Sequence, residues 1–107
     1  LGPHTWPQLY EEAGGARQSP IDISTDQVTL DPKLSSKQLT WSWPKKTLDV
    51  TNTGYGWKAH VHGDDSCLRG GPLKDHYKLE QYHMHWGPED STGSEHLVDG
   101  QAYAGEV

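Results

Sequence analysis

The stretch "HYKLEQYHMHWG", residues 76–87, is the longest segment of the chain whose residues alternate with a period of two. Side chains at positions i and i+2 of a β-strand point to the same face, about 6.6 Å apart along the strand. His83 and His85 therefore share a face, and two imidazoles at this spacing can bind one ion at Zn–N distances of about 2.0–2.1 Å. Gln81 lies on the same face, where it can fix the tautomer of a ligating histidine. The alternative is that the two histidines are polar residues of an ordinary strand.

The same alternation recurs along most of the chain and predicts a β-dominated architecture of short strands. No segment shows a convincing helical stripe, and residues 1–18, rich in glycine and proline, are expected to be irregular. The segments with strand-like alternation are residues 19–24, 27–31, 38–43, 47–54, 56–63 and 76–87.

Length and composition narrow the function classes. The 107 residues suffice for one small domain, and the formal net charge of -6 argues against nucleic-acid binding, which needs a basic surface. No apolar run approaches the ~20 residues of a membrane span. Leu, Ile and Val total 17 and Phe is absent, so we expect part of a larger core rather than a complete one.

Other polar residues carry weaker signals. Cys67 is the only cysteine, which excludes an internal disulfide and a four-cysteine zinc site, and no base lies near it in the sequence. His60 and His62 repeat the spacing of the first histidine pair. They alternate with Trp57, Ala59 and Val61, so we expect them to be exposed to solvent rather than to ligate a metal.

Six strings, taken together and in order, resemble the α-class carbonic anhydrases. They span nearly the whole chain: "RQSPIDI" (17–23), "NTGY" (52–55), "GGPL" (70–73), "YKLEQYHMHWG" (77–87), "GSEHLVD" (93–99) and "YAGEV" (103–107). The resemblance implies a twisted, mainly antiparallel sheet with zinc at the floor of a conical cleft. Residues 1–107 would be the N-terminal part of one such domain.

The resemblance also implies roles for individual residues. His83 and His85 correspond to the first two zinc ligands, and Gln81 to the residue that hydrogen-bonds the first of them. Glu95 corresponds to a buried acid that holds a downstream threonine hydroxyl. His96 corresponds to a structural network histidine, and Glu106 to the acid that orients the third zinc ligand.

Two departures from the family pattern affect the expected chemistry. The third zinc-ligating histidine should come directly after Val107, outside this sequence. Tyr55 stands at the family's proton-shuttle position, where the most active members carry histidine. Tyrosine at this position resembles the mitochondrial members. Histidine titrates near neutrality whereas tyrosine titrates near pH 10, so we expect poor proton transfer there.

The expected activity is the zinc-dependent, reversible hydration of carbon dioxide to bicarbonate and a proton, with carbon dioxide and bicarbonate as its small-molecule partners. With two histidine ligands, the 107-residue chain alone should bind zinc poorly, catalyse little and aggregate or stay partly unfolded. It would need the rest of the domain, in the same or another chain. The alternatives are a non-catalytic binding domain of this family and a histidine-rich metal binder that uses His60 and His62 as well.

The expected compartment also rests on the resemblance. Secreted members often have a disulfide whose first cysteine would fall near Ala13, and no cysteine is present there. A cytoplasmic enzyme is therefore expected, with a mitochondrial one as the alternative.

Overall fold

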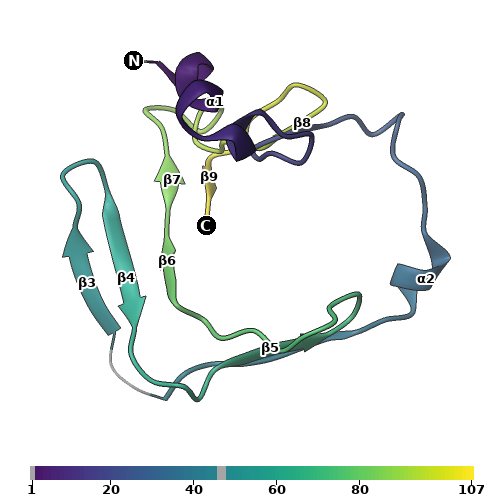
Figure 1. Cartoon of the computed structure of the whole chain (residues 1–107), viewed down its shortest axis with the longest axis vertical. Helices are drawn as coiled ribbons and strands as arrows, with labels where there is room; N and C mark the ends of the chain where they lie inside the picture. Colours follow the sequence, from purple (N-terminus) through teal and green to yellow (C-terminus); the bar gives the residue numbers. More distant parts are fainter. Residues whose placement is uncertain (1, 46–47) are drawn as a thin grey trace.

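The fold is a set of short strands in four small sheets, wound into an open ring. The computed structural model describes residues 2–45 and 48–107. Figure 1 shows the ring, with strands along its left and lower sides, the helical turn α2 on the loop at the right and α1 at the top. The strands are β1 (Asp22–Ile23), β2 (Leu39–Ser42), β3 (Leu48–Asn52), β4 (Trp57–Val61), β5 (Cys67–Gly70), β6 (Gln81–His83), β7 (His85–Trp86), β8 (Leu97–Val98) and β9 (Gly105–Glu106).

Three of the four sheets are antiparallel. β3, β4 and β6 form the largest sheet in that order, while β2 pairs with β5 and β7 pairs with β9. β1 and β8 run parallel to each other. This β-dominated architecture agrees with the prediction from the sequence.

The sheet β3–β4–β6 holds the buried apolar residues of the described chain. Ala59 and Val61 are 1% and 6% exposed, and the ring of Trp57 packs edge-on against Tyr82 at a centroid distance of 6.0 Å. The predicted alternation in residues 56–63 is therefore correct for this strand. β3 also falls within its predicted segment, whose first residue, Thr47, lies outside the described residues.

Several expectations from the sequence are wrong in detail. Residues 27–31, which include Val28 and Leu30, do not form a strand, because no neighbouring chain pairs with them. Residues 1–18 are not wholly irregular: they contain the helical turns η1 (Pro3–Thr5), α1 (Trp6–Leu9) and η2 (Glu11–Gly14). A further turn, α2 (Pro32–Ser35), is capped by the Asp31 side chain, which accepts a hydrogen bond from the backbone N–H of Lys33 at 2.9 Å.

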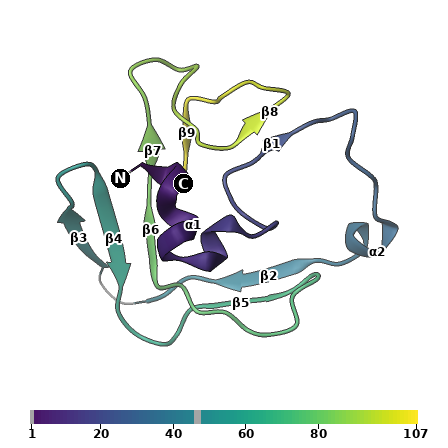
Figure 2. The same ribbon diagram turned by 45° about the horizontal axis from the view of Figure 1, so that its top comes forward.

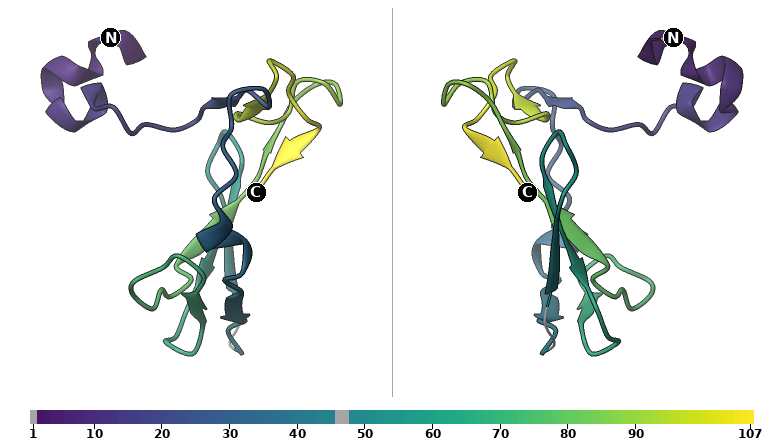
Figure 3. Two further views of the ribbon diagram at one scale, coloured as in Figure 1. Left: turned by 90° about the vertical axis from the view of Figure 1, so that its right-hand side faces the viewer. Right: turned by 90° about the vertical axis from the view of Figure 1, so that its left-hand side faces the viewer.

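The ring does not enclose a core of its own. The radius of gyration is 17.2 Å, whereas a compact chain of this length has about 13 Å. Figure 2 shows the N-terminal helical turns in front of the opening of the ring, and Figure 3 shows them set apart from the strands; among the described helices and strands, these turns contact only one another. In the described part of the chain, none of the helices has the length and apolar character needed to cross a membrane.

Candidate metal centre

The register of the sheet β3–β4–β6 sorts its side chains onto two faces. Residues directly opposite each other in an antiparallel pair share a face. Lys58 pairs with His83 and His60 pairs with Gln81, so these four side chains share what we call the polar face. The residues that alternate with them, including Ala59 and Tyr82, form the apolar face. The sheet therefore presents His83 away from its buried side.

His83 and His85 lie next to each other on two consecutive strands. His83 ends β6 and His85 begins β7, with Met84 between them. Their ring centroids are 5.1 Å apart and the rings are inclined at 77°. Both side chains are partly exposed and line a cavity of about 220 Å³. The structure thus brings together the two histidines that the spacing in the sequence pairs.

Gln81 contacts the first of these histidines. Its side-chain oxygen Oε1 lies 2.9 Å from Nδ1 of His83. An amide oxygen can only accept a hydrogen bond, so Nδ1 of His83 carries the proton and donates it. The Nε2 atom of the neutral ring then keeps its lone pair, which is the form in which histidine binds a metal ion.

Glu106 lies opposite His85 in the pairing of β7 with β9. Its Oε2 atom accepts backbone hydrogen bonds from Glu95 at 2.9 Å and from His96 at 2.8 Å, and its Oε1 atom contacts Nδ1 of His96 at 2.6 Å. The pKa of Glu106 is lowered, first by the backbone N–H of His96 and then by the His96 side chain. Glu106 is therefore an ionised carboxylate fixed beside the histidine strand.

Glu95 is placed differently from what the resemblance implied. Its side chain is 52% exposed rather than buried, and its Oε2 atom lies 3.4 Å from Nε2 of His85. Among the described residues, Glu95 therefore contacts His85, one of the paired histidines.

Tyr55 stands at the edge of the same cavity. It follows Gly54, whose φ of 87° suits a glycine, in a turn closed by the Thr53 backbone N–H donating to the Gly56 carbonyl oxygen at 2.8 Å. The side chain is 91% exposed. The turn therefore brings Tyr55 to the cavity but leaves its hydroxyl group open to solvent.

Lys58 is a cavity residue that the sequence analysis did not identify. It lines the cavity with His83, the residue opposite it in the neighbouring strand. The alternation of residues 56–63 does place Lys58 on one face with His60 and His62. The alternation does not predict the strand register, which places this face beside Gln81 and His83.

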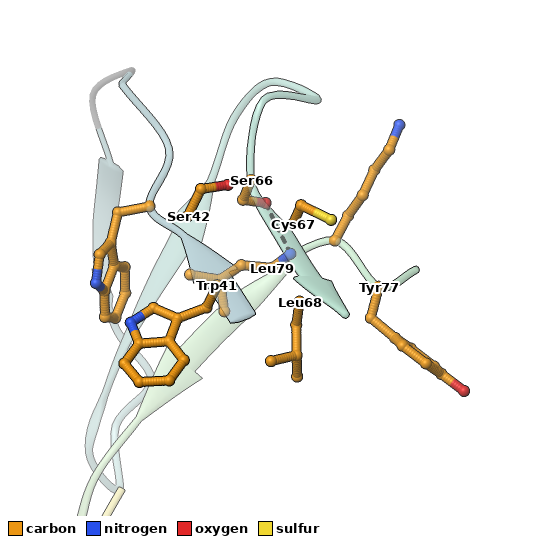
Figure 4. A pocket seen from close by; sticks show the side chains of 9 residues that line it. Trp41, Ser42, Ser66, Cys67, Leu68, Tyr77 and Leu79 are labelled. Carbon is orange, nitrogen blue, oxygen red and sulfur yellow. Dashed lines mark hydrogen bonds between the residues drawn. The ribbon is translucent and has the colours of Figure 1, made fainter. Parts of the chain in front are cut away.

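A second cavity, of about 270 Å³, lies between β2, β5 and the segment before β6. Figure 4 shows Trp41, Leu68, Tyr77 and Leu79 around it, with the hydrogen bond from the Leu79 backbone N–H to Ser66 Oγ, 2.9 Å long. Cys67 lines this mainly apolar cavity and is half-buried. Neither a histidine nor an acidic residue lines this cavity, but Cys67 also borders a neighbouring cavity that His76 lines.

A complete metal site is not formed by residues 2–45 and 48–107. Nowhere in these ranges do three or more histidine, cysteine, aspartate or glutamate side chains come close enough together to hold a metal ion. The paired imidazoles of His83 and His85 are thus two ligands of a site that needs at least one more.

Together these features define a β-sheet protein with a paired-histidine site. The family description "Eukaryotic-type carbonic anhydrase" matches residues 1–107. The chain is 43% identical over 110 residues to carbonic anhydrase 1 of Mus musculus, covering 99% of this chain and 41% of that protein. It is 41% identical over 108 residues to carbonic anhydrase 3 of Rattus norvegicus, with the same coverage of 99% and 41%.

The chain therefore belongs to the eukaryotic-type carbonic anhydrase family. It spans about two fifths of the length of these relatives.

Proposed function

We propose that this chain is the N-terminal part of a zinc-dependent carbonic anhydrase that reversibly hydrates carbon dioxide to bicarbonate and a proton. The observation that carries the proposal is the pair of adjacent imidazoles, His83 and His85, in one cavity, with the first held by Gln81. Membership of the family supports the same reaction.

His83 and His85, the metal-ligating residues within this chain, are suited to zinc. Neutral imidazole is a preferred ligand of Zn²⁺, and the Gln81 contact leaves Nε2 of His83 free to bind it. A catalytic zinc usually has three protein ligands and an open position. His83 and His85 would supply two of the three.

The strand register supports the place of the third ligand. His85 pairs with Glu106 in the antiparallel pair β7–β9, so each step back from His85 matches a step forward from Glu106. If the pairing continues, the residue opposite His83 is the one that follows Val107, two positions after Glu106 and on the same face. In a chain that continues past Val107, a histidine there would face the pair directly.

Zinc, when bound, supplies the positive charge that turns water into a nucleophile near neutral pH, an effect best known from carbonic anhydrases themselves. The residues of this chain would orient the site. Gln81 fixes the ring of His83. Glu106, held by His96 and by the backbone N–H of Glu95, would orient the third ligand.

Hydration of carbon dioxide releases a proton that must reach solvent. Tyr55, which the resemblance assigns to the shuttle position, lines the cavity and is open to solvent. An ordinary tyrosine stays protonated near neutral pH, so it does not accept and release a proton as histidine does. We therefore expect buffer molecules to carry much of this proton. To hold the downstream threonine hydroxyl that the resemblance implies, the Glu95 carboxylate would have to move away from His85.

The proposal extends to partners and location. Carbon dioxide and bicarbonate are the expected small molecules, and the rest of the domain is the expected partner of residues 1–107, which alone would be inactive. The expected location of the enzyme is the cytoplasm, with mitochondria as the alternative. A non-catalytic relative is less well supported, because both ligand positions within this chain carry histidine.

The test is to measure zinc content and carbon dioxide hydration of the full-length protein. We expect one zinc per molecule and hydration that is lost in His83→Ala and His85→Ala. The matched control is His76→Ala, because His76 is exposed and does not line this cavity. Absence of both zinc and hydration from the full-length protein would contradict the proposal, and so would equal loss of activity in the control.

A further inference from the structure

A second pair of histidines lies at the polar face of the same sheet. His60 lies on β4, His62 directly follows the last residue of β4, Val61, and both histidines are exposed. Their ring centroids are 5.2 Å apart and inclined at 71°, against 5.1 Å and 77° for His83 and His85. The two pairs therefore present their imidazoles with nearly the same separation.

An acidic residue supports the second pair as Gln81 supports the first. Asp49 on β3 lies opposite His60, and its Oδ2 atom contacts Nε2 of His62 on the same polar face. Because an ionised carboxylate only accepts hydrogen bonds, this contact holds the proton on Nε2 in the neutral ring. Nδ1 of His62 then keeps its lone pair. A carboxylate behind an imidazole is the usual support of a metal-ligating histidine.

We propose that His60 and His62 bind a divalent transition-metal ion, copper or zinc, in a second site separate from His83 and His85. The site supplies two imidazole nitrogens, with Asp49 holding His62 and water completing the coordination. Calcium and magnesium are excluded because they prefer oxygen ligands. For nitrogen ligands the affinity of first-row divalent ions is greatest for Cu²⁺.

The surroundings leave the proposed site open to an ion from solvent but limit its affinity for that ion. The His62 and Asp49 side chains are 53% and 71% exposed, so an ion can reach them from solvent. The negative charge of Asp49 favours a cation, whereas Lys58, two positions before His60 on the same face, disfavours it. With two ligands and this mixed charge, we expect weaker binding than at a complete three-histidine site.

The test is a Cu²⁺ titration of the full-length protein after it has been loaded with zinc. We expect one additional equivalent of Cu²⁺ to bind and, because the ion is paramagnetic, to broaden the imidazole NMR signals of His60 and His62 most strongly. In His60→Gln and His62→Gln this equivalent should be lost. Asp49→Asn should bind Cu²⁺ about 10–100-fold more weakly, the effect typical of removing such a support.

The matched control is His76→Gln, which removes an exposed histidine outside the sheet β3–β4–β6 and should leave the titration unchanged. The thermal transition of each variant shows that it is folded. The proposal is overturned if the His60 and His62 variants bind the same number of copper equivalents as the wild type. Broadening of other histidine signals in place of these two would also overturn it.

Discussion

The hydrogen bond from His83 to Gln81 gives a quantitative prediction for zinc affinity. In the full-length protein, Gln81→Leu removes the acceptor of the 2.9 Å bond and leaves Nδ1–H of His83 unpaired in a partly exposed position. A hydrogen bond between neutral groups contributes about 0.5–1.5 kcal/mol, and about 1.4 kcal/mol corresponds to a tenfold change in affinity. We therefore expect zinc to bind about tenfold more weakly, at the lower end of the range of about 10–100-fold for such partners.

The assay is competition for zinc between the protein and a chelator of known affinity. Gln81→Glu keeps an acceptor at this position and should retain at least the wild-type affinity. Gln38→Leu is the matched control, since Gln38 is exposed and lies outside the cavity. If Gln81→Leu binds zinc within twofold of the wild type, or if the control weakens binding equally, the hydrogen bond does not support the ligand.

Three further predictions for the full-length protein concern Tyr55 at the proton-shuttle position, the buried residue Val61 and the hydrogen-bonded carboxylate of Asp99. Tyr55→His should raise turnover in dilute buffer roughly tenfold. This gain is smaller than the ~10²–10⁴-fold effect of a well-positioned acid or base, because residue 55 is so exposed. The dependence of kcat on buffer concentration should weaken in parallel. Val61→Ala removes two methyl groups from a side chain that is 6% exposed and should lower the free energy of unfolding by about 2 kcal/mol in denaturant titrations. The pKa of Asp99 is lowered by the backbone N–H and then the hydroxyl of Thr25, so the ionised form is favoured in the folded state. Asp99→Asn tolerates the same φ of 49° but should be less stable than the wild type at pH 7, and the difference should shrink as pH falls below about 4.

The sequence predicted the strands that alternate and have a partner. Residues 56–63 alternate strictly: His60 and His62 are exposed as predicted, and Ala59 and Val61 between them and Trp57 are buried. Residues 27–31 show the same alternation without a partner strand, because pairing depends on chain segments that local sequence does not specify. The N-terminal helical turns span three or four residues each, too few for a helical period to appear.

The candidate site was predictable within one continuous stretch of sequence but not between segments that pair across the sheet. The spacing of His83 and His85, and the position of Gln81 beside them, follow from the period of two, and the structure places all three together. Asp49 and Lys58 were missed as neighbours of histidines because each belongs to another strand. Their proximity follows from the register, which depends on where the turns between strands begin and end.

The register also restricts how the histidine pair can be completed. On one side of His83 the opposite position, on β4, is occupied by Lys58, whose ammonium group has no lone pair to offer a metal ion. On the other side, β9 lies against His85, with Glu106 directly opposite it. A third ligand at the level of His83 can therefore come from the β9 side and not from the neighbouring position of β4. This asymmetry explains why the His60 and His62 pair, although on the same face, does not complete the first site: His60 lies opposite Gln81, two positions further from His85 than His83 is. The two histidine pairs are thus kept apart by the pairing of β4 with β6, and each has its own supporting side chain.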